Sequence, residues 1–230
     1  MQMTVTSPIR ALSVRAALTG VMLVALAPGL GAQSASDIVG RMLDEYARRA
    51  ERVDDYTLVQ QVMGFETVSY FEKEMVDGRP VFRLRGGTTA GMDMPEQSQT
   101  GMDEIFAIGD ELARRAEYQG VERVDDYDLH VLHIDDFDGL DFARSVAPDS
   151  EFNPRTGRLY LDVDTYAPRR LEFEGEMRNA QGTHTVTTTV RMGDYREAEG
   201  MLIAYNTSVR IDGLAAAIDP ETRAQFEQMQ

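Results

Sequence analysis

The clearest pattern in the chain is an alternation of apolar and polar residues between positions 157 and 212. Short segments rich in turn-forming residues interrupt it. Alternation with a period of two, broken by short turns, is typical of antiparallel strands with one apolar and one polar face. Four strands are therefore predicted, at residues 157–164, 170–178, 185–192 and 203–211, the last with Ile203, Tyr205, Thr207, Val209 and Ile211 on one side.

A helix is predicted to begin at Ser34, before the first strands. Ser34 is followed three residues later by Asp37, which is the spacing of a helix-capping pair. Apolar residues then recur at intervals of three and four through Val53, which gives an amphipathic helix of about four turns. This helix is the first candidate to cover the apolar face of the sheet.

Residues 56–76 are predicted to form two strands, 56–65 and 67–76. The first carries apolar residues on both faces, so we expect it to lie beneath a helix or loop. Asp77-Gly78 then predicts a tight hairpin, and the chain returns as a strand over residues 81–85.

Residues 86–103 are predicted to be a loop. They contain four glycines and three methionines, Met92, Met94 and Met102. Methionines on a flexible loop form an adaptable apolar surface, and long loops in compact domains are usually functional or disordered. Two interpretations stay open, an apolar lid and an insertion without a role.

The remaining elements complete an α+β domain. A second helix starts at Asp103, a hairpin follows at 118–134 with its turn at Asp125-Asp126, and residues 135–154 form an acidic connection. Asp219-Pro220 has the form of a last helix start. The pattern as a whole predicts an antiparallel sheet whose apolar face is covered by helices.

Residues 1–33 have the features of a secretory signal peptide, which leaves 34–230 as a single domain. Arg10 and Arg15 precede an apolar run that is too short for a comfortable membrane span and contains Pro28 and Gly29. An uncleaved anchor is the alternative. The chain contains no cysteine, so we expect no disulfide, no thiol chemistry and no lipid anchor of its own in the periplasm.

The formal net charge of −16 argues against two classes of partner. A strongly acidic surface repels the phosphates of nucleic acids and of anionic membranes. We therefore expect no nucleic-acid binding.

The residues that could carry catalysis or bind a metal do not form a recognisable site. His130 and His133 lie three apart on a predicted strand and so point to opposite faces, and His184 is isolated. The acidic segment 135–139 resembles the start of a calcium loop but lacks its first acid and its twelfth-position glutamate. No nucleophile and base are paired, so no catalytic residue, metal or cofactor is expected.

The chain resembles the lipoprotein-sorting proteins of the outer membrane, the LolA/LolB-like superfamily. The resemblance covers about residues 36–213 and is carried by two motifs, the hairpin LYLDVDTYAPRRL at 159–171 and the segment GDYR…EGMLIAY at 193–205. It implies a single curved antiparallel sheet, an incomplete β-barrel, with helices on its open, apolar side and acyl chains bound between them. The family's lid depends on an arginine, for which Arg83 and Arg85 are both candidates.

We therefore expect a monomeric, non-catalytic periplasmic carrier or sensor that binds lipid or lipoprotein acyl chains in a hydrophobic cavity. The alternative is an envelope protein-interaction or regulatory module, as in the related RseB proteins, with a filled core and a membrane-protein partner. The residues expected to line the cavity and its lid are Phe82, Leu84, Met92, Met94, Ile105, Phe106, Leu159, Leu161, Leu171, Phe173, Met177, Val186 and Val190.

Overall fold

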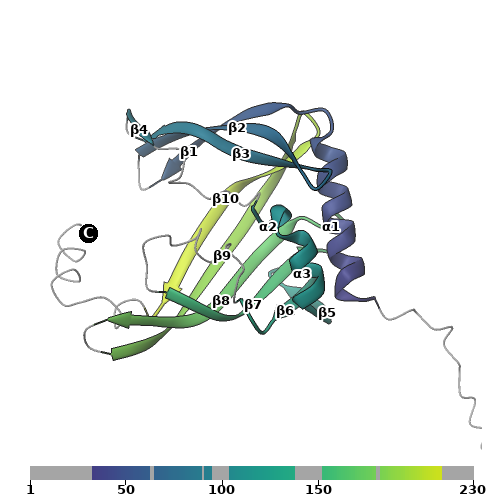
Figure 1. Cartoon of the computed structure of the whole chain (residues 1–230), viewed down its shortest axis with the longest axis vertical. Helices are drawn as coiled ribbons and strands as arrows, with labels where there is room; N and C mark the ends of the chain where they lie inside the picture. Colours follow the sequence, from purple (N-terminus) through teal and green to yellow (C-terminus); the bar gives the residue numbers. More distant parts are fainter. Residues whose placement is uncertain are drawn as a thin grey trace, which may run out of the picture. The chain divides into compact units, whose positions relative to one another are not determined.

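The computed structural model describes residues 33–62, 65–89, 91–94, 104–137, 152–179 and 182–213. Residues 1–32, nearly all of the expected signal peptide, lie outside these ranges, as does the helix expected to start at Asp219. Both stay predictions. The described part of the chain is built mainly of antiparallel strands with three helices (Figure 1).

The strands form two antiparallel sheets, here called sheet A and sheet B. Sheet A has the order β1-β2-β3-β4, and sheet B the order β10-β9-β8-β7-β6-β5. The strands of sheet A are β1 (Asp55–Val62), β2 (Phe65–Val76), β3 (Arg79–Thr89) and β4 (Met92–Met94). Those of sheet B are β5 (Glu117–Val124), β6 (Tyr127–Ile134), β7 (Phe152–Asp162), β8 (Pro168–Asn179), β9 (Gly182–Ala198) and β10 (Met201–Asp212).

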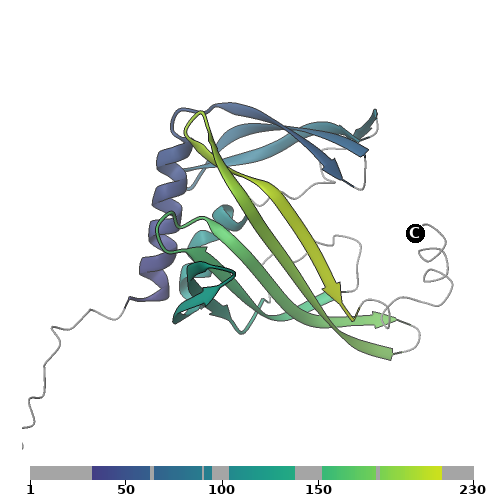
Figure 2. The ribbon, with the colours of Figure 1, turned by 180° about the vertical axis from the view of Figure 1, so that it is seen from behind.

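The prediction of a single curved sheet is wrong, because the described strands form two sheets. Within the described residues, β1 and β10 are edge strands of separate sheets, and neither sheet closes on itself. Alternation along a sequence predicts where strands run and which face is apolar, but not which distant edges share hydrogen bonds. The four predicted strands at 157–211 are confirmed as β7 to β10, and β8, β9 and β10 are seen side by side from behind in Figure 2.

Helix α1 (Ala35–Ala50) begins where the sequence predicts. The Ser34 hydroxyl accepts a hydrogen bond from the Asp37 amide at 3.1 Å, and the Asp37 carboxylate accepts one from the Ser34 amide at 3.0 Å. At the other end, Lys73, the only lysine in the chain, donates to the carbonyl of Glu51 at 3.3 Å and pairs with Asp54 at 2.8 Å. A cation beside the last carbonyls stabilises a helix end, so both termini of α1 are anchored.

Two predictions about sheet A are corrected. The first strand ends at Val62 rather than at Phe65, and Val59 is 58% exposed, so β1 is covered on one face only. The loop expected from residue 86 begins later, because β3 continues to Thr89 and residues 92–94 form β4. Gly86 and Gly87 have a low intrinsic strand propensity, which favours a loop in the sequence. In the structure, hydrogen bonding to β2 outweighs this propensity and keeps both residues in β3.

The predicted second helix is found over the expected residues but is divided into two helices, α2 (Glu104–Ala107) and α3 (Gly109–Arg115). Both predicted hairpin turns are confirmed. Asp77 and Gly78 have φ of 49° and 78°, and Asp125 and Asp126 have φ of 48° and 70°. Two consecutive positive φ values suit the right-handed twist of hairpin strands. No helix in the described ranges has the length and hydrophobicity of a membrane span.

Candidate functional site

The candidate site is built on the face of sheet B that packs against the helices, here called the inner face. Residues directly opposite one another on paired strands share a face of the sheet. The pairings join Leu132, Leu159, Leu171, Val190 and Val209 into one row across β6, β7, β8, β9 and β10. All five side chains are aliphatic, so an apolar band crosses five of the six strands.

A second row lies beside the first. It joins Ile134, Gly157, Phe173, Thr188 and Ile211 in the same strand order. Gly157 supplies no side chain, and its place in the row is filled from above, since a Cβ there would lie 2.6 Å from the ring of Phe137. That ring also meets Phe173 edge to face at 5.4 Å.

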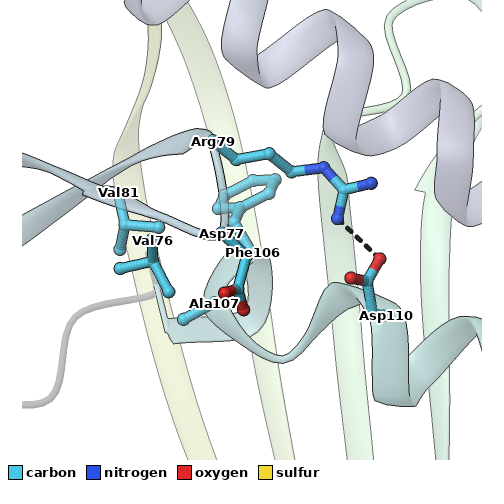
Figure 3. A pocket seen from close by; sticks show the side chains of 7 residues that line it. All are labelled: Val76, Asp77, Arg79, Val81, Phe106, Ala107 and Asp110. Carbon is cyan, nitrogen blue, oxygen red and sulfur yellow. Dashed lines mark hydrogen bonds and ion pairs between the residues drawn. The ribbon is translucent and has the colours of Figure 1, made fainter.

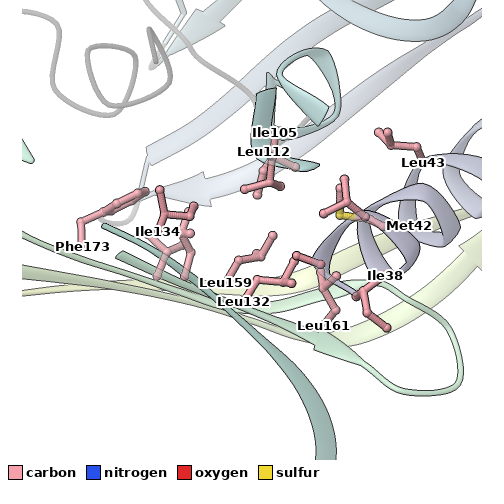
Figure 4. Close-up of a cluster of buried hydrophobic side chains, with 14 of the residues drawn as sticks. Ile38, Met42, Leu43, Ile105, Leu112, Leu132, Ile134, Leu159, Leu161 and Phe173 are labelled. Carbon is pink, nitrogen blue, oxygen red and sulfur yellow. The ribbon is translucent and has the colours of Figure 1, made fainter. Parts of the chain in front are cut away.

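The helices cover the β6, β7 and β8 end of these rows. Ile38, Met42 and Leu43 of α1, with Ile105 of α2 and Leu112 of α3, pack on them in one buried cluster (Figure 4). In the first row, Leu132 and Leu159 have no exposed surface and Leu171 has 2%. This part of the inner face is filled core.

The cover ends at β10. Val190 is 6% exposed and its partner Val209 is 59% exposed, while Thr188 is 6% exposed and its partner Ile211 is 42% exposed. Neither row contains a charged residue. The first row is apolar throughout and therefore continues from the core into an exposed strand, while the second row has one polar side chain, Thr188, on the way.

The residues predicted to line a cavity fall into several groups. Six lie in the buried cluster that the helices form with sheet B: Ile105, Leu159, Leu161, Leu171, Phe173 and Val190. Val186 is 1% exposed but belongs to none of the three clusters that the described residues form. Met177 is half-buried at the end of β8, and Met92 is 69% exposed. Met94 lies in β4, and its side chain is outside the described set.

The other three predicted residues belong to a second cluster, between the end of α1 and sheet A. Phe82 is buried there, and Leu84 packs against it. Phe106 contacts both clusters and stacks on Tyr46 of α1 with ring centroids 3.7 Å apart. Phe106 thus joins the two groups of lining residues that the sequence predicted as one.

Two hollows among the described residues lie away from the rows. One, of about 10 Å³, lies beneath the β2–β3 turn beside Phe106, where Arg79 pairs with Asp110 at 2.6 Å (Figure 3). That volume holds about one water molecule. A larger open hollow of about 280 Å³ lies on β1 and β2, between Tyr56, Tyr70 and Arg85.

Arginines that the sequence did not single out attach α1 to the β7–β8 turn. Arg41 donates to the hydroxyl of Tyr166 at 2.9 Å, and Arg49 donates to the carbonyl of Thr165 at 3.0 Å. The candidate lid arginines, Arg83 and Arg85, instead form ion pairs with carboxylates of β2. Sequence spacing could not indicate the roles of Arg41 and Arg49, because the residues that they contact are more than a hundred positions away in the chain.

The β7–β8 turn itself is held by one carboxylate. Asp162 accepts hydrogen bonds from the amide and hydroxyl of Thr165 at 3.0 and 2.9 Å, and pairs with Arg169 at 3.1 Å. The Arg169 guanidinium also lies over the rings of Tyr127 and Tyr195, at 4.3 and 4.8 Å from their centroids. The hairpin motif at residues 159–171 therefore has a structural role, because its polar residues hold the β7–β8 turn.

Two of the histidines lie on opposite faces of β6. His130 is buried on the inner side, and His133 pairs with Asp135 at 2.7 Å. Among the residues described, no group of three or more potential metal ligands is found.

The chain matches no protein-family model and no curated protein sequence. Among solved structures, it is similar to a domain named as an outer membrane lipoprotein-sorting protein domain, from Vibrio parahaemolyticus. The TM-score is 0.32 with 12% sequence identity, over 84% of this chain and 100% of that one.

Proposed function

We propose that the protein is a non-catalytic periplasmic carrier or sensor that binds the acyl chains of lipids or lipoproteins on the inner face of sheet B. One observation carries the proposal. The two uncharged rows, of which the first is apolar throughout, pass from the covered core at β7 and β8 to the exposed side chains of Val209 and Ile211 on β10. A contiguous exposed apolar surface that extends a core is typical of a binding site for an apolar partner.

The proposal divides the residues predicted from the sequence into two roles. Those beneath α1, such as Leu159, Leu161 and Leu171, hold the fold together, because helices already occupy the space above them. The acyl chain lies farther along the rows, on a surface here called the acyl face. It consists of the exposed side chains of Val209 and Ile211, with half-buried Met177 at the end of β8. The buried side chains of Phe173, Val186 and Val190 lie next to it on the same face of the sheet.

The driving force is the removal of apolar surface from water. Each buried methylene of an acyl chain contributes about 0.8 kcal/mol, and covering an exposed valine or isoleucine adds about 1.5–3 kcal/mol. An uncharged face keeps this gain, since a carboxylate covered by an acyl chain would oppose it strongly.

A titration with a fluorescent fatty acid tests the proposal. In the mature chain, the double variant Val209→Asp, Ile211→Asp should weaken binding at least tenfold, about 1.4 kcal/mol. Both residues are exposed, so the variant should fold. Val59→Asp is the matched control, because Val59 is equally exposed at 58% but lies on β1 of the other sheet.

Two results would contradict acyl binding at this face. One is a double variant that binds as well as the natural chain. The other is an equal loss of binding in Val59→Asp, which would mean that the probe responds to overall charge.

A protein-interaction module is the second candidate, and the filled cluster under α1 favours it. In that case the exposed apolar rows would receive a protein surface rather than a lipid. The same variants separate the two candidates. A salt-dependent pulldown of an envelope protein that is lost in the double variant, with no lipid or fatty acid bound by the natural chain, would support the module.

A further inference from the structure

A buried histidine lies where three strands, a turn and α1 meet. His130 of β6 is 5% exposed. Its Nδ1 shares a hydrogen bond of 2.9 Å with the hydroxyl of Tyr118 on β5. Its ring stacks on Tyr166 of the β7–β8 turn, with centroids 5.5 Å apart and planes 18° from parallel.

Tyr166 also receives the helix. Arg41 of α1 donates to the Tyr166 hydroxyl at 2.9 Å, and its guanidinium carbon lies 5.9 Å from the ring centroid. The turn holds Tyr166 at a φ of 55°, with its amide donating to the carbonyl of Asp162 at 2.9 Å. One tyrosine thus contacts both the buried imidazole and the helix that covers the inner face.

The groups facing His130 favour its neutral form. Burial lowers the pKa of His130, and the positive charge of Arg41 on α1 lowers it further. The carboxylate of Asp162 on β7 acts in the opposite direction, but it already pairs with Arg169. Tyr118 and Tyr166 contact the imidazole through their rings and, for Tyr118, the hydroxyl.

We propose that His130 is a proton-operated latch for the amino-terminal half of α1. Neutral His130 supports Tyr166, which binds Arg41 and keeps α1 on the inner face of sheet B. A proton on His130 places a second cation near Arg41 and charges a buried ring. The stack is weakened, and α1 loosens at this end. The latch does not depend on what the inner face binds.

Hydrogen exchange of the whole mature protein tests the latch. After correction for intrinsic rates, α1 amides should exchange faster as pH falls from about 7.5 to about 5, by at most about tenfold per pH unit for one proton. Amides of β8 should change less. His130→Gln should remove the response of α1, whereas His133→Gln, on the opposite face of β6, should keep it.

Retention of the full response in His130→Gln would overturn the latch, as would a natural chain whose α1 does not respond to pH. Should His130→Gln fail to fold, two other readouts decide. The His130 imidazole, one of three in the chain, should titrate below 6.5 by NMR, and Arg41→Gln should raise its titration point. Titration at or above 6.5, or no change in Arg41→Gln, would overturn the proposal.

Discussion

Val190 and Val209 lie directly opposite each other on β9 and β10, yet one is 6% exposed and the other 59%. Paired residues of one type on one face usually share their surroundings, because their side chains are neighbours. The difference marks the line where the helical cover of sheet B ends. On one side of it the apolar rows are core, and on the other they are surface.

Stability should change sharply across this line. Leu171→Ala, two strands inside it, should lower the free energy of unfolding by about 2–5 kcal/mol, since it opens a cavity in a packed cluster. Val209→Ala should cost less than about 0.5 kcal/mol, because an exposed side chain has few contacts to lose. Urea unfolding measures both, and equal losses would contradict the boundary.

The absence of a side chain at Gly157 should be essential for packing. A Cβ there would lie 2.6 Å from the Phe137 ring and 2.8 Å from the Glu172 carbonyl oxygen. Gly157→Ala should therefore cost about 1–3 kcal/mol. Gly40 of α1 is the matched control, because a Cβ there meets nothing within 4 Å, so Gly40→Ala should stabilise the protein by up to about 1 kcal/mol. Similar effects of the two changes on the thermal midpoint would argue against this packing.

Asp162 should make the stability of the turn depend on pH. Burial raises the pKa of its carboxyl, but hydrogen bonds from Thr165 and Arg169 outweigh burial and hold the pKa below the ordinary 3.8. Because the folded pKa is lower than the unfolded one, the stabilisation is complete well above pH 3.8 and is lost as pH falls through the folded value. Asp162→Asn should cost about 1–3 kcal/mol at neutral pH.

The cost of Asp162→Asn should shrink in acid, where the natural carboxyl is itself protonated. Asp164→Asn, in the same turn, changes the same charge without touching these hydrogen bonds and should have little effect at any pH. Denaturant unfolding between about pH 7 and pH 3 compares the variants. A constant difference between Asp162→Asn and the natural chain would contradict the assigned role.

Arg169 should not be replaceable by lysine. Its planar guanidinium pairs with Asp162 while lying over the rings of Tyr127 and Tyr195. An ammonium keeps the charge but cannot form the same fork and stack. Arg169→Lys should lower the free energy of unfolding by about 1–2 kcal/mol, whereas Arg178→Lys, at the exposed end of β8, should change it little. Equal changes in the free energy of unfolding for the two variants would mean that Arg169 stabilises the protein through its charge alone.

The sequence predicts most of the strands and α1 because those signals are local. Alternation locates β7 to β10, Asp77-Gly78 the first hairpin, and Ser34 with Asp37 the helix start. The division into two sheets depends on which strands far apart in the sequence form hydrogen bonds with each other. No local sequence signal encodes this pairing. The division of the second helix into α2 and α3 was not predictable either, since Phe106 of α2 contacts both clusters and its neighbours come from distant parts of the chain.

The candidate site was predictable only in part. The alternation placed Val190 and Phe173 on the apolar face, but it could not separate residues under α1 from residues beyond it. Val209 and Ile211 share the alternating pattern but do not belong to the predicted lining, although they are the exposed part of the rows. Exposure depends on where the helices end, which is a property of the whole fold.

Native mass spectrometry of the mature protein, purified from a bacterial periplasm, tests acyl binding most directly. Acyl binding predicts a co-purified phospholipid or acylated peptide on the natural chain. The double variant Val209→Asp, Ile211→Asp should lose that mass, and Val59→Asp should retain it. A natural chain that carries no lipid and takes up no added fatty acid would contradict the proposed function.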